Sequence, residues 1–511
     1  MKISKFMTQN SRFFIAYPIV LILTIMALML LQDRSWFLGF FFLISASLLI
    51  YIYGISKKIP GKYLLPGVLL LILFQVYPAV YSGFVAFTND SNGHQISKEQ
   101  AIEAIIDDSK IPSENSAPVP FKGAIKDSSE ELFIVFEYPA SQVWISNGIK
   151  TDSVPESQII RSEEMKINQI AGFQILSDSE FTQYASVAQE IQIRMPGNIY
   201  LQPADFENLE VYEPSLSYSV ARDEIVDKLS GVIYRPNNNG QMESADGEVL
   251  YPGWKANVGI KNFSSIATNE EIRRPILAVL TWTFVNAFFV VTTGFLMGLI
   301  LALIFNFPQM RSKRFYRTIF IIPMAIPSVL SFLVWAGLFT TETGVIDRIF
   351  GLSIPWLTDA FWARIAVLIV ELWITFPYMF LITTGAIQSI PGEILEAAEI
   401  DGASPIKSFR LIKLPLVMRT VAPLLVASGA MALNNFGAIY LLTGGGPTFA
   451  NSNGNAGATD ILISYTYKLA FNAQEGNNYG LASALSILNF ILVGSLSIYG
   501  FRRMKTMEGV N

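Results

Sequence analysis

The chain alternates long apolar runs with short polar stretches, and eight of these runs are long enough to cross a bilayer as helices. A helical span needs about 20 predominantly apolar residues, because the hydrocarbon layer is about 30 Å thick and a helix rises about 1.5 Å per residue. We interpret the first run as a retained span, since it is longer than a signal-peptide core and has no convincing small-residue cleavage site. The pattern therefore predicts an α-helical polytopic membrane protein. The expected spans cover approximately residues 13–31, 36–55, 64–88, 276–305, 316–339, 362–388, 420–442 and 480–500.

The pattern changes between the third and fourth runs, where apolar and polar residues alternate over short stretches. Such alternation is typical of strands, and the clusters of Asn, Gly, Pro and Ser between the stretches predict turns. We therefore divide the chain into N-terminal spans at 1–88, a β-rich inserted domain at 89–275 and the remaining spans at 276–511. Within the insert we expect strands at Leu132–Phe136, Gln142–Ile145, Ile167–Leu176, Val232–Tyr234 and Glu248–Tyr251, a helix around Lys98–Asp107 and a turn at Asn237–Gly240.

Charge is distributed unevenly between these parts. Of the 41 acidic and 36 basic residues in the chain, the segment 90–274 carries 29 acidic and 15 basic residues, so the remainder is net basic. The basic residues of that remainder lie before the first span, after the second, after the fourth, after the sixth and after the last. Because short cytoplasmic loops are enriched in Lys and Arg, this alternation predicts cytoplasmic termini and an insert outside the cell.

The chain has no cysteine and a single histidine, His94. These counts exclude disulfides, thiolate chemistry, histidine-based zinc sites and Ser-His triads. No catalytic constellation is recognisable among the many carboxylates of the insert, and a solvated acidic surface is their plainest interpretation. We therefore expect neither catalytic residues nor a metal site in this chain.

A polar stretch at about 389–419 separates the sixth and seventh apolar runs. Pro391 is expected at the first position of a helix that ends at Gly402 in a left-handed conformation. Ser404 then caps a second short helix, with Pro405 at its first position. Two short helices at a bend suit docking into another protein, and the alternative is an amphipathic helix that lies on the bilayer surface.

The same stretch resembles the EAA motif of the membrane subunits of ABC importers. In that family the loop sits in a cleft of a separate ATPase subunit and transmits its movement to the membrane helices. The resemblance implies that Glu396 pairs with an ATPase arginine and that Gly402 supplies the bend, where a larger residue would clash if φ is positive. Every fixed position of the motif matches, namely Glu396, Ala397, Ala398, Gly402, Ile412, Leu414 and Pro415.

Nucleotide chemistry is expected on that separate subunit. The segment Gly402–Ser408 only superficially resembles a phosphate-binding loop, because Ile406 replaces the second glycine and a helix precedes the segment where a strand is needed. The chain is therefore expected to be no enzyme and to hold no cofactor, with ATP and Mg²⁺ bound by the partner ATPase.

Further segments narrow the resemblance to carbohydrate importers. Together with a large domain inserted after the third of eight spans, they are similar to the larger membrane subunits of the maltose and maltodextrin ABC importers, which have the type I importer permease fold. The segments are Tyr77–Ser82 with Phe87–Asn89, Tyr234–Asn238, Lys261–Phe263, Pro323–Ser328, Trp373 with Pro377 and Tyr378, Asn434–Phe436, Leu441–Thr443 with Gly445–Pro447, and Tyr465–Tyr467.

The resemblance implies a location in a bacterial inner membrane with the insert, about 89–275, in the periplasm, and it also implies a set of partners and a working cycle. The expected partners are a smaller second permease subunit, two ATPase subunits, a periplasmic sugar-binding protein that contacts the insert, an oligosaccharide cargo and membrane lipid, without nucleic acid. ATP would close the ATPases, which carry the loop with them and switch the cavity between inward-facing and outward-facing states.

Sugar recognition inside a membrane needs aromatic faces and hydrogen-bonding groups in a water-filled cavity. By resemblance, Tyr378, Ser428 and Asn435 occupy positions that match sugar contacts of that family. Ser428 and Asn435 are seven residues apart and are expected to share a helix face. The alternative is that these polar residues only join helices to one another.

Four positions depart from the family's sugar site. Where the family has Asn, Gly, Phe and Asn, this chain has Glu371, Thr375, Met431 and Ala432. A carboxylate at 371 is costly in lipid and has to face the cavity or a partner. It is expected either to accept sugar hydroxyls, as Thr375 would, or to pair with Arg364.

The leading interpretation is a non-enzymatic pore subunit of an ATP-driven importer for maltose-like oligosaccharides. The first alternative is the same machine with another cargo, such as trehalose or a different glycoside. A secondary transporter would need no ATPase-binding loop. A membrane sensor should carry a cytoplasmic signalling domain, for which residues 501–511 leave no room.

Overall fold

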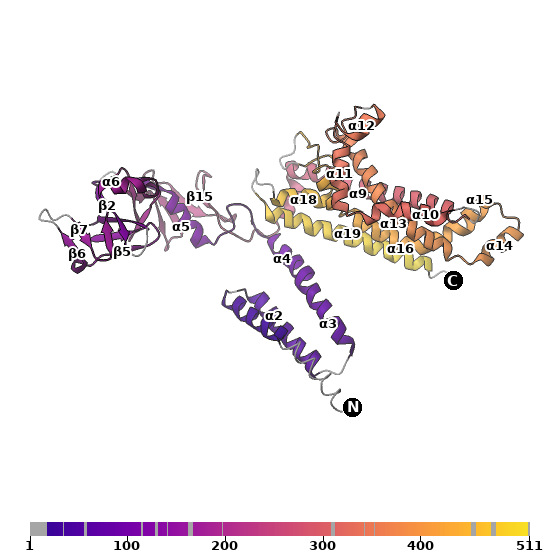
Figure 1. The fold of residues 1–511 in the computed structure, drawn as a ribbon, viewed down its shortest axis with the longest axis horizontal. Coiled ribbons are helices and arrows are strands. Elements are labelled where there is room, and N and C mark those ends of the chain that lie inside the picture. The colour runs from indigo at the N-terminus through magenta and orange to yellow at the C-terminus, as the bar shows by residue number, and fades with distance from the viewer. Residues whose placement is uncertain are drawn as a thin grey trace. The chain divides into compact units, whose positions relative to one another are not determined.

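The chain forms two compact units in a computed structural model (Figure 1). A helical unit comprises residues 1–87, 260–475 and 479–511, and a β-rich unit comprises residues 88–259 with 476–478. Residues 260–275, which the sequence boundary at 275 placed in the insert, lie in the helical unit. The structure describes residues 18–33, 35–55, 59–113, 116–127, 131–139, 142–161, 167–196, 198–307, 312–341, 343–351, 353–450, 456–471 and 477–508.

The helical unit contains most of the expected spans. Among the described residues, six helices are long and apolar enough to cross a membrane, or seven if one bent pair is counted as a span. The six are Trp36–Tyr53, Tyr63–Val85, Glu270–Phe305, Ala360–Gln388, Pro405–Ala432 and Tyr479–Arg503. By element, the unit consists of α2 (Trp36–Leu49), η1 (Ile50–Ile55), α3 (Ile59–Leu71), η2 (Ile72–Val76), α4 (Tyr77–Val85), α8 (Lys261–Thr268), α9 (Glu270–Phe305), α10 (Lys313–Ala325), α11 (Ser328–Leu338), α12 (Val345–Phe350), α13 (Ala360–Gln388), α14 (Gly392–Ile400), α15 (Pro405–Ser408), η5 (Phe409–Lys413), α16 (Leu414–Ala432), α17 (Phe436–Leu442), α18 (Leu462–Phe471) and α19 (Tyr479–Glu508).

The first and fifth expected spans differ from continuous helices. Residues 13–17 lie outside the described residues, and the remainder of the first span is a short apolar helix, Pro18–Gln32. The fifth is bent by 90° between α10 and α11. Ile326 is extended there because Pro327 follows it, and a residue before proline is disfavoured in the helical region.

The seventh expected span, 420–442, is wrong at both ends. The observed span starts at Pro405, because the second helix of the polar stretch runs through the π-helical turn η5 into α16 without a break. It stops at Ala432, where the Asn434 side chain donates a hydrogen bond to the Ala430 carbonyl (3.2 Å) and Phe436 N–H donates to the Asn434 carbonyl (2.8 Å). Asparagine side chains compete in this way with helical hydrogen bonds, so residues 433–435 separate α16 from the short α17.

Helices α9 and α13 form the closest pair in the unit. A Cβ atom added at Gly298 of α9 would lie 2.6 Å from the Met379 carbonyl carbon and the Phe380 nitrogen of α13. Met379 and Phe380 are themselves fully buried. Small residues permit such backbone approach in membrane helices, where van der Waals packing replaces the hydrophobic effect between helices.

The β-rich unit contains two sheets. The larger has eleven strands with the central order β5-β4-β3-β2-β11-β10-β9, and the smaller follows chain order from β12 to β16, with antiparallel neighbours. The strands are β1 (Lys110–Pro112), β2 (Val119–Lys126), β3 (Leu132–Glu137), β4 (Val143–Ser146), β5 (Thr151–Ser153), β6 (Ile159–Arg161), β7 (Ile167–Ile170), β8 (Phe173–Ile175), β9 (Ile193–Met195), β10 (Ile199–Pro203), β11 (Asn208–Pro214), β12 (Leu216–Ser219), β13 (Glu224–Asp227), β14 (Ile233–Pro236), β15 (Met242–Ser244) and β16 (Val249–Leu250).

The insert's expected strands and helix are present. β3, β4, β14 and β16 lie at four of the predicted stretches, and the fifth forms the hairpin β7–β8. The predicted helix is α5 (Lys98–Asp108), which starts with a capping box between Ser97 and Gln100. The remaining helices are α6 (Asp178–Phe181) and α7 (Ala185–Gln189), with single 3₁₀ turns η3 (Glu156–Gln158) and η4 (Thr182–Tyr184).

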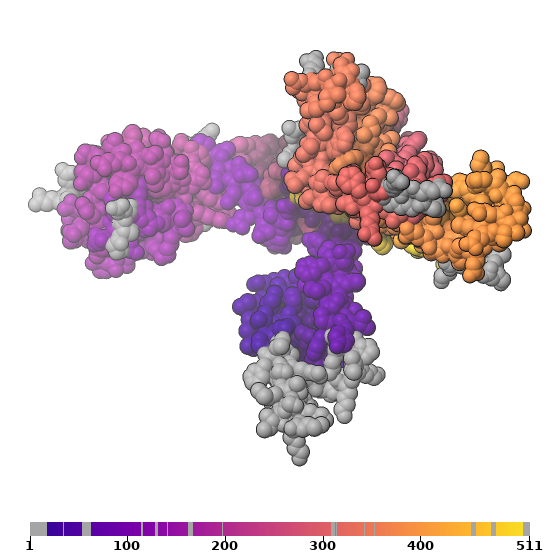
Figure 2. Space-filling model, turned by 45° about the vertical axis from the view of Figure 1, so that its right-hand side comes forward, coloured from indigo at the N-terminus to yellow at the C-terminus, as the bar shows by residue number. Residues whose placement is uncertain are grey.

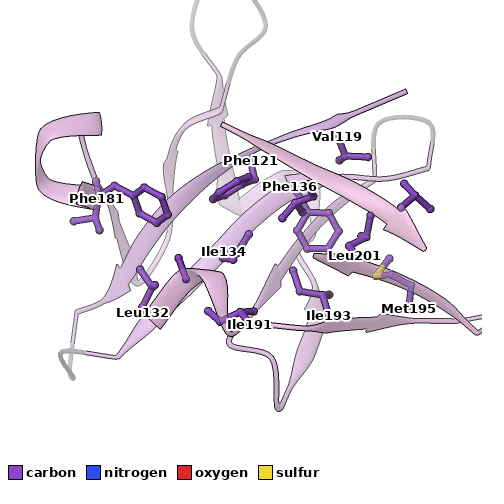
Figure 3. Close-up of a cluster of buried hydrophobic side chains, with 14 residues drawn as sticks. Val119, Phe121, Leu132, Ile134, Phe136, Phe181, Ile191, Ile193, Met195 and Leu201 are labelled. Carbon is purple, nitrogen blue, oxygen red and sulfur yellow. The ribbon is translucent and has the colours of Figure 1, made fainter. Parts of the chain in front are cut away.

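One apolar cluster holds the larger sheet together (Figure 3). Phe121 of β2 and Phe136 of β3 are paired across the strands, and Phe181 of α6 covers Phe121 with a perpendicular ring at 5.6 Å. Ile134 and Leu201 are fully buried beside them. Because this core is built from strands far apart in the sequence, the unit has its own folding core.

Candidate functional site

The polar loop of residues 389–419 begins with α14, one residue later than expected. Pro391 is the N-cap residue, and Gly392 is the first helical residue. Glu393 lies in the first turn, where a carboxylate is favoured by the helix dipole. The helix forms for the predicted reason, with its boundary shifted by a single position.

The bend after α14 is a backbone structure centred on Gly402, whose φ is +73°. Gly402 N–H donates to the Glu399 carbonyl (3.0 Å), and Ala403 N–H donates to the Ala398 carbonyl (2.9 Å). This pair of bonds satisfies the last carbonyls of α14. The positive φ that the expected clash requires is therefore present, and since a Cβ atom at 402 would meet no atom of a described residue within 4 Å outside its own chain neighbours, the constraint comes from the local backbone.

The second half of the loop is the beginning of a membrane span. Ser404 Oγ accepts a hydrogen bond from Lys407 N–H (3.4 Å), and Pro405 is the first helical residue, as predicted. Contrary to expectation, the second helix is not short, because α15, η5 and α16 form one continuous helix from Pro405 to Ala432. The π-helical turn at Phe409–Lys413 adds a residue to one turn and so changes which side chains face inwards.

The loop presents apolar side chains on a polar segment. Ile400, Ile406 and Leu411 are 86%, 78% and 70% exposed, and Ile394 is exposed as well. Phe409 instead packs inwards. Of the motif residues, Glu396, Ala397, Gly402 and Pro415 are exposed, Ile412 and Leu414 are half-buried, and Ala398 is buried. In Figure 2 this region, coloured orange, forms a projecting end of the helical unit, and in Figure 1 it lies near the C-terminus of the chain.

A buried polar cluster lies among the spans. Glu371 of α13 is 2% exposed, and its Oε2 accepts a hydrogen bond from Asn286 Nδ2 of α9 at 2.8 Å. Its Oε1 accepts from Asn435 Nδ2, in the break after α16, at 2.7 Å. Asn286 is fully buried, and its Oδ1 has no hydrogen-bond partner among the described residues. The cluster thus joins α9, α13 and the 433–435 break.

The expected pairing of Glu371 with Arg364 is not formed. Arg364 Nε donates to the Ala458 carbonyl at 2.8 Å, and its guanidinium lies 5.0 Å from the centre of the Trp282 ring. The two residues are on the same helix, two turns apart, so each finds its partners at a different depth.

The other predicted cargo residues lie near this cluster in the sequence but are not bonded to it. Tyr378, Thr375 and Ser428 are half-buried, and no described hydrogen bond joins them to Glu371. Ser428 and Asn435 do not share a helix face, because α16 ends between them. Met431 is 76% exposed.

Sequence reasoning missed Asn286 and an aromatic group beside the break. Asn286 carried a signal, since an amide within an apolar span is costly unless it is bonded. In the aromatic group, Phe436 and Tyr440 of α17 stack at 5.0 Å, and Tyr467 of α18 contacts both rings. The spacing of Phe436 and Tyr440 suited a shared helix face, whereas nothing in the sequence linked Tyr467 to them.

Solved structures show a likeness over part of the chain. A bacterial ABC transporter involved in the import of the acidic polysaccharide alginate is 24% identical and covers 48% of this chain and 84% of its own, with a TM-score of 0.42. The MetNI methionine ABC transporter in an inward-facing conformation is 19% identical and covers 46% of this chain and 98% of its own, with a TM-score of 0.35.

Two family models match the chain. Residues 294–504 match the binding-protein-dependent transport system inner membrane component. Residues 69–147 match the N-terminal part of the transmembrane subunit in PBP-dependent ABC transporters. The first match includes α10 to α18 and therefore both the polar loop and the 433–435 break.

Curated relatives match almost from end to end. The maltose/maltodextrin transport system permease proteins MalF of Salmonella typhimurium and Escherichia coli K12 are each 32% identical over 477 residues, which is 91% of this chain and 91% of theirs. MalF of Vibrio cholerae is 32% identical over 484 residues, or 91% of this chain and 89% of its own. With helices that can cross a membrane several times, an inserted β-rich unit and this coverage, the chain belongs to the MalF family of ABC transporter permease proteins.

Proposed function

We propose that this chain is the larger permease subunit of an ATP-driven importer that moves maltose- or maltodextrin-type oligosaccharides by alternating access. The observation that carries the proposal is the polar loop, which is exposed, bent at Gly402 and continuous with α16. An exposed surface that runs without a break into a membrane helix can pass a partner's movement into the membrane. MalF relatives named for maltose and maltodextrin transport support the choice of cargo.

The coupling route starts in α15 and enters the packed core. Val417 and Val421 of α16 are buried in one cluster with Leu299 of α9 and Ala386 of α13. Because protein interiors are close-packed, a displacement of α15 moves these contacts rather than being absorbed by empty space. Movement of the loop would thereby reach the three helices that enclose the Glu371 cluster.

The partner on the loop is proposed to be an ATPase subunit, of which the assembly holds two that resemble MalK. Exposed Ile400, Ile406 and Leu411 supply apolar contact area, and Glu396 supplies a charged contact. ATP and Mg²⁺ are bound by those subunits, while this chain pairs with a smaller, MalG-like permease subunit. None of these contacts requires a catalytic residue in this chain.

The proposed orientation has both termini in the cytoplasm and the insert in the periplasm, facing a sugar-binding protein. The distribution of basic residues supports it. The C-terminal end of α19 and the polar loop also lie at the same end of the helical unit (Figure 1). An even number of crossings would place the N-terminus on that side too.

The cargo is proposed to contact Tyr378, Thr375, Ser428 and Asn435 at membrane depth. The Tyr378 ring offers a stacking face, and the other three offer hydrogen-bonding groups for hydroxyls. Glu371 is too buried to share that contact, and it holds Asn435 instead.

Copurification from detergent-solubilised membranes tests the assembly. A tagged chain should retain an ATPase, and Ile406→Asp should weaken that retention by about tenfold or more, because burying an isoleucine contributes about 1.5–3 kcal/mol. Ile149→Asp is the matched control, since Ile149 is 94% exposed in the insert and lies far from the loop in the chain. Glu396→Lys should abolish sugar uptake with the chain still inserted.

An ATPase that never copurifies, or uptake that persists without ATP, would reject the proposal. Equal retention of the ATPase by both isoleucine variants would favour a loop that lies on the bilayer surface.

A sugar panel tests the cargo in reconstituted complexes. Maltose and maltodextrins should stimulate ATP hydrolysis more than trehalose or other glycosides. Tyr378→Ala should reduce that stimulation without changing subunit copurification. Stimulation by a different glycoside alone would keep the importer but replace the cargo, and unchanged kinetics in Tyr378→Ala would remove this residue from the site.

A further inference from the structure

The carboxylate of Glu371 is enclosed by the two amides that bond it. Asn286 and Asn435 each place a side-chain nitrogen on a different oxygen, at 2.8 and 2.7 Å. With 2% of its surface exposed, Glu371 has no room to meet a solute directly. Glu371 therefore acts only through its hydrogen bonds to Asn286 and Asn435.

We infer that Glu371 is a positioning residue that fixes the side-chain amide of Asn435 so that Asn435 presents its carbonyl oxygen, a hydrogen-bond acceptor, to the cargo. The inference rests on the proposed function, because it assumes that Asn435 faces the oligosaccharide. It assigns to Glu371 a role in selecting cargo that does not require contact with cargo.

The direction of the Asn435 amide follows from donor and acceptor chemistry. Both side-chain oxygens of Glu371 accept a hydrogen bond from an amide nitrogen, whereas an asparagine side chain has one donating and one accepting end. The nitrogen of Asn435 therefore faces Glu371, and its Oδ1 faces away. No described residue donates to this Oδ1, and it is not among the buried atoms that lack a partner.

Reversing the amide would be strongly unfavourable. It would bring Oδ1 against an oxygen of Glu371 at hydrogen-bond distance and lose the hydrogen bond between the two side chains, which is worth roughly a 10-fold bias between the two orientations. A sugar hydroxyl that meets Asn435 Oδ1 must then donate to it, and a group that can only accept is disfavoured at that position.

Neighbouring contacts hold the cluster in place on both sides. Asn286 is fully buried on α9 and fixes the second oxygen of Glu371. On the other side of the break, Asn434 Oδ1 accepts from Asn489 Nδ2 of α19 at 2.9 Å. Consecutive asparagines thus tie residues 433–435 to two other spans, α13 and α19, which limits rotation of Asn435 by backbone movement.

Fluorinated sugars provide the test, because fluorine in place of a hydroxyl removes the donor while keeping a weak acceptor of similar size. Reconstituted full complexes with the ATPase and binding protein are assayed with maltose and with maltose analogues that carry fluorine at one hydroxyl position each. The readout is the ratio of ATPase stimulation, kcat/KM, between maltose and each analogue. The same binding protein is used for every variant, so its own preference cancels in comparisons between variants.

The wild-type complex should reject at least one analogue, and Glu371→Gln should reduce that rejection by about tenfold, because glutamine can donate to Asn435 and let its amide reverse. Asn435→Asp alone should lose transport, since two carboxylates would face each other. Combining Asn435→Asp with Glu371→Gln should restore transport and the rejection, because the carboxylate introduced at position 435 would again offer only an acceptor.

Thr383→Val is the matched control. Thr383 is fully buried on the same helix, and its hydroxyl has no partner among the described residues, so the preference should not change. Copurification of the ATPase confirms that each variant is assembled.

Two results would overturn the inference: the same rejection ratio in Glu371→Gln as in the wild type, or a double variant no better than Asn435→Asp. Uniform acceptance of all analogues by the wild type would also overturn it, by removing Asn435 from the contact. A wild-type complex that no maltose-type sugar stimulates would instead contradict the proposed function.

Discussion

The chain turns sharply at Gly402 and again at residues 433–435, and the two turns are held in opposite ways. At Gly402 the backbone has a positive φ, two main-chain hydrogen bonds close the turn, and no described residue packs where a side chain would lie. At 433–435 the turn is made by side chains, because Asn434 and Asn435 bond to Asn489 and Glu371 of other helices.

The difference separates a turn that is available to a partner from one that is closed to it. The turn at Gly402, which is made by the backbone, stays exposed and can be bound by a partner protein. A turn made by buried side chains is set by the arrangement of the surrounding helices, and it changes only when they do. We therefore expect the turn at Gly402 to receive the partner's movement and the turn at residues 433–435 to respond to it.

The largest effect is expected at the exposed turn. Gly402→Val should abolish sugar uptake while the chain still inserts, because a β-branched residue is strongly disfavoured at positive φ. Gly402→Asn is the matched comparison, since asparagine visits the left-handed region, and it should retain most of the uptake. Uptake assays with membrane-fraction blots measure both. Equal failure of the two variants would mean that contact with the partner, not φ, requires glycine.

A smaller effect is expected at the buried turn. Asn286→Leu should destabilise the unit by about 1–3 kcal/mol, because Glu371 loses one of its two donors and keeps an unsatisfied oxygen in the interior. Thermal unfolding of the purified complex, compared with Thr383→Val, measures the loss. A melting temperature unchanged from that of the control would show that Asn435 alone supports the carboxylate.

The smallest effect is expected at a partly exposed ion pair in the insert. In the insert, Lys98 Nζ donates to Asp223 Oδ1 at 2.6 Å, and the two side chains are 28% and 43% exposed. The Lys98 ammonium, helped by the Tyr218 hydroxyl and opposed by burial, holds the pKa of Asp223 below its usual range. The pair therefore stabilises the insert above about pH 4, and its contribution is lost as the pH falls through the lowered pKa.

Lys98→Met should flatten this acid dependence slightly. Hydrogen exchange of β12 and β13 in the full-length protein between about pH 3 and 6 measures it. Lys150→Met is the control, because Lys150 and Asp152 form a pair that is more exposed. An equal response of both variants would show that the Lys98 pair has no special role.

The same contrast explains what could be predicted from the sequence. Glycine, proline and serine act on their own backbone, so the bend at Gly402 and the start of the helix at Pro405 were predicted correctly. The membrane spans were predicted where the length of the apolar run alone determines whether a helix can cross the membrane. The 90° bend at Ile326 followed from Pro327, although the expected span ran through it.

Contacts between distant segments could not be predicted. Glu371 was recognised as costly, but the partners considered for it were sugar hydroxyls and Arg364 on its own helix, whereas Asn286 lies on α9 and Asn435 in the break after α16. In the insert, β9 and β13 are only three and four residues long, too short for a pattern to identify them, and they are defined by their neighbours in the sheets. The end of α16 was missed because Asn434 interrupts an apolar run without a proline or glycine to mark it.

The near-contact at Gly298 limits how the membrane part can rearrange. With its α-carbon almost against the main chain of Met379 and Phe380, α9 cannot slide along α13 without pulling the two backbones apart. We therefore expect these two helices to travel as a single rigid block during a transport cycle, with the hinges at segment ends such as Gly402.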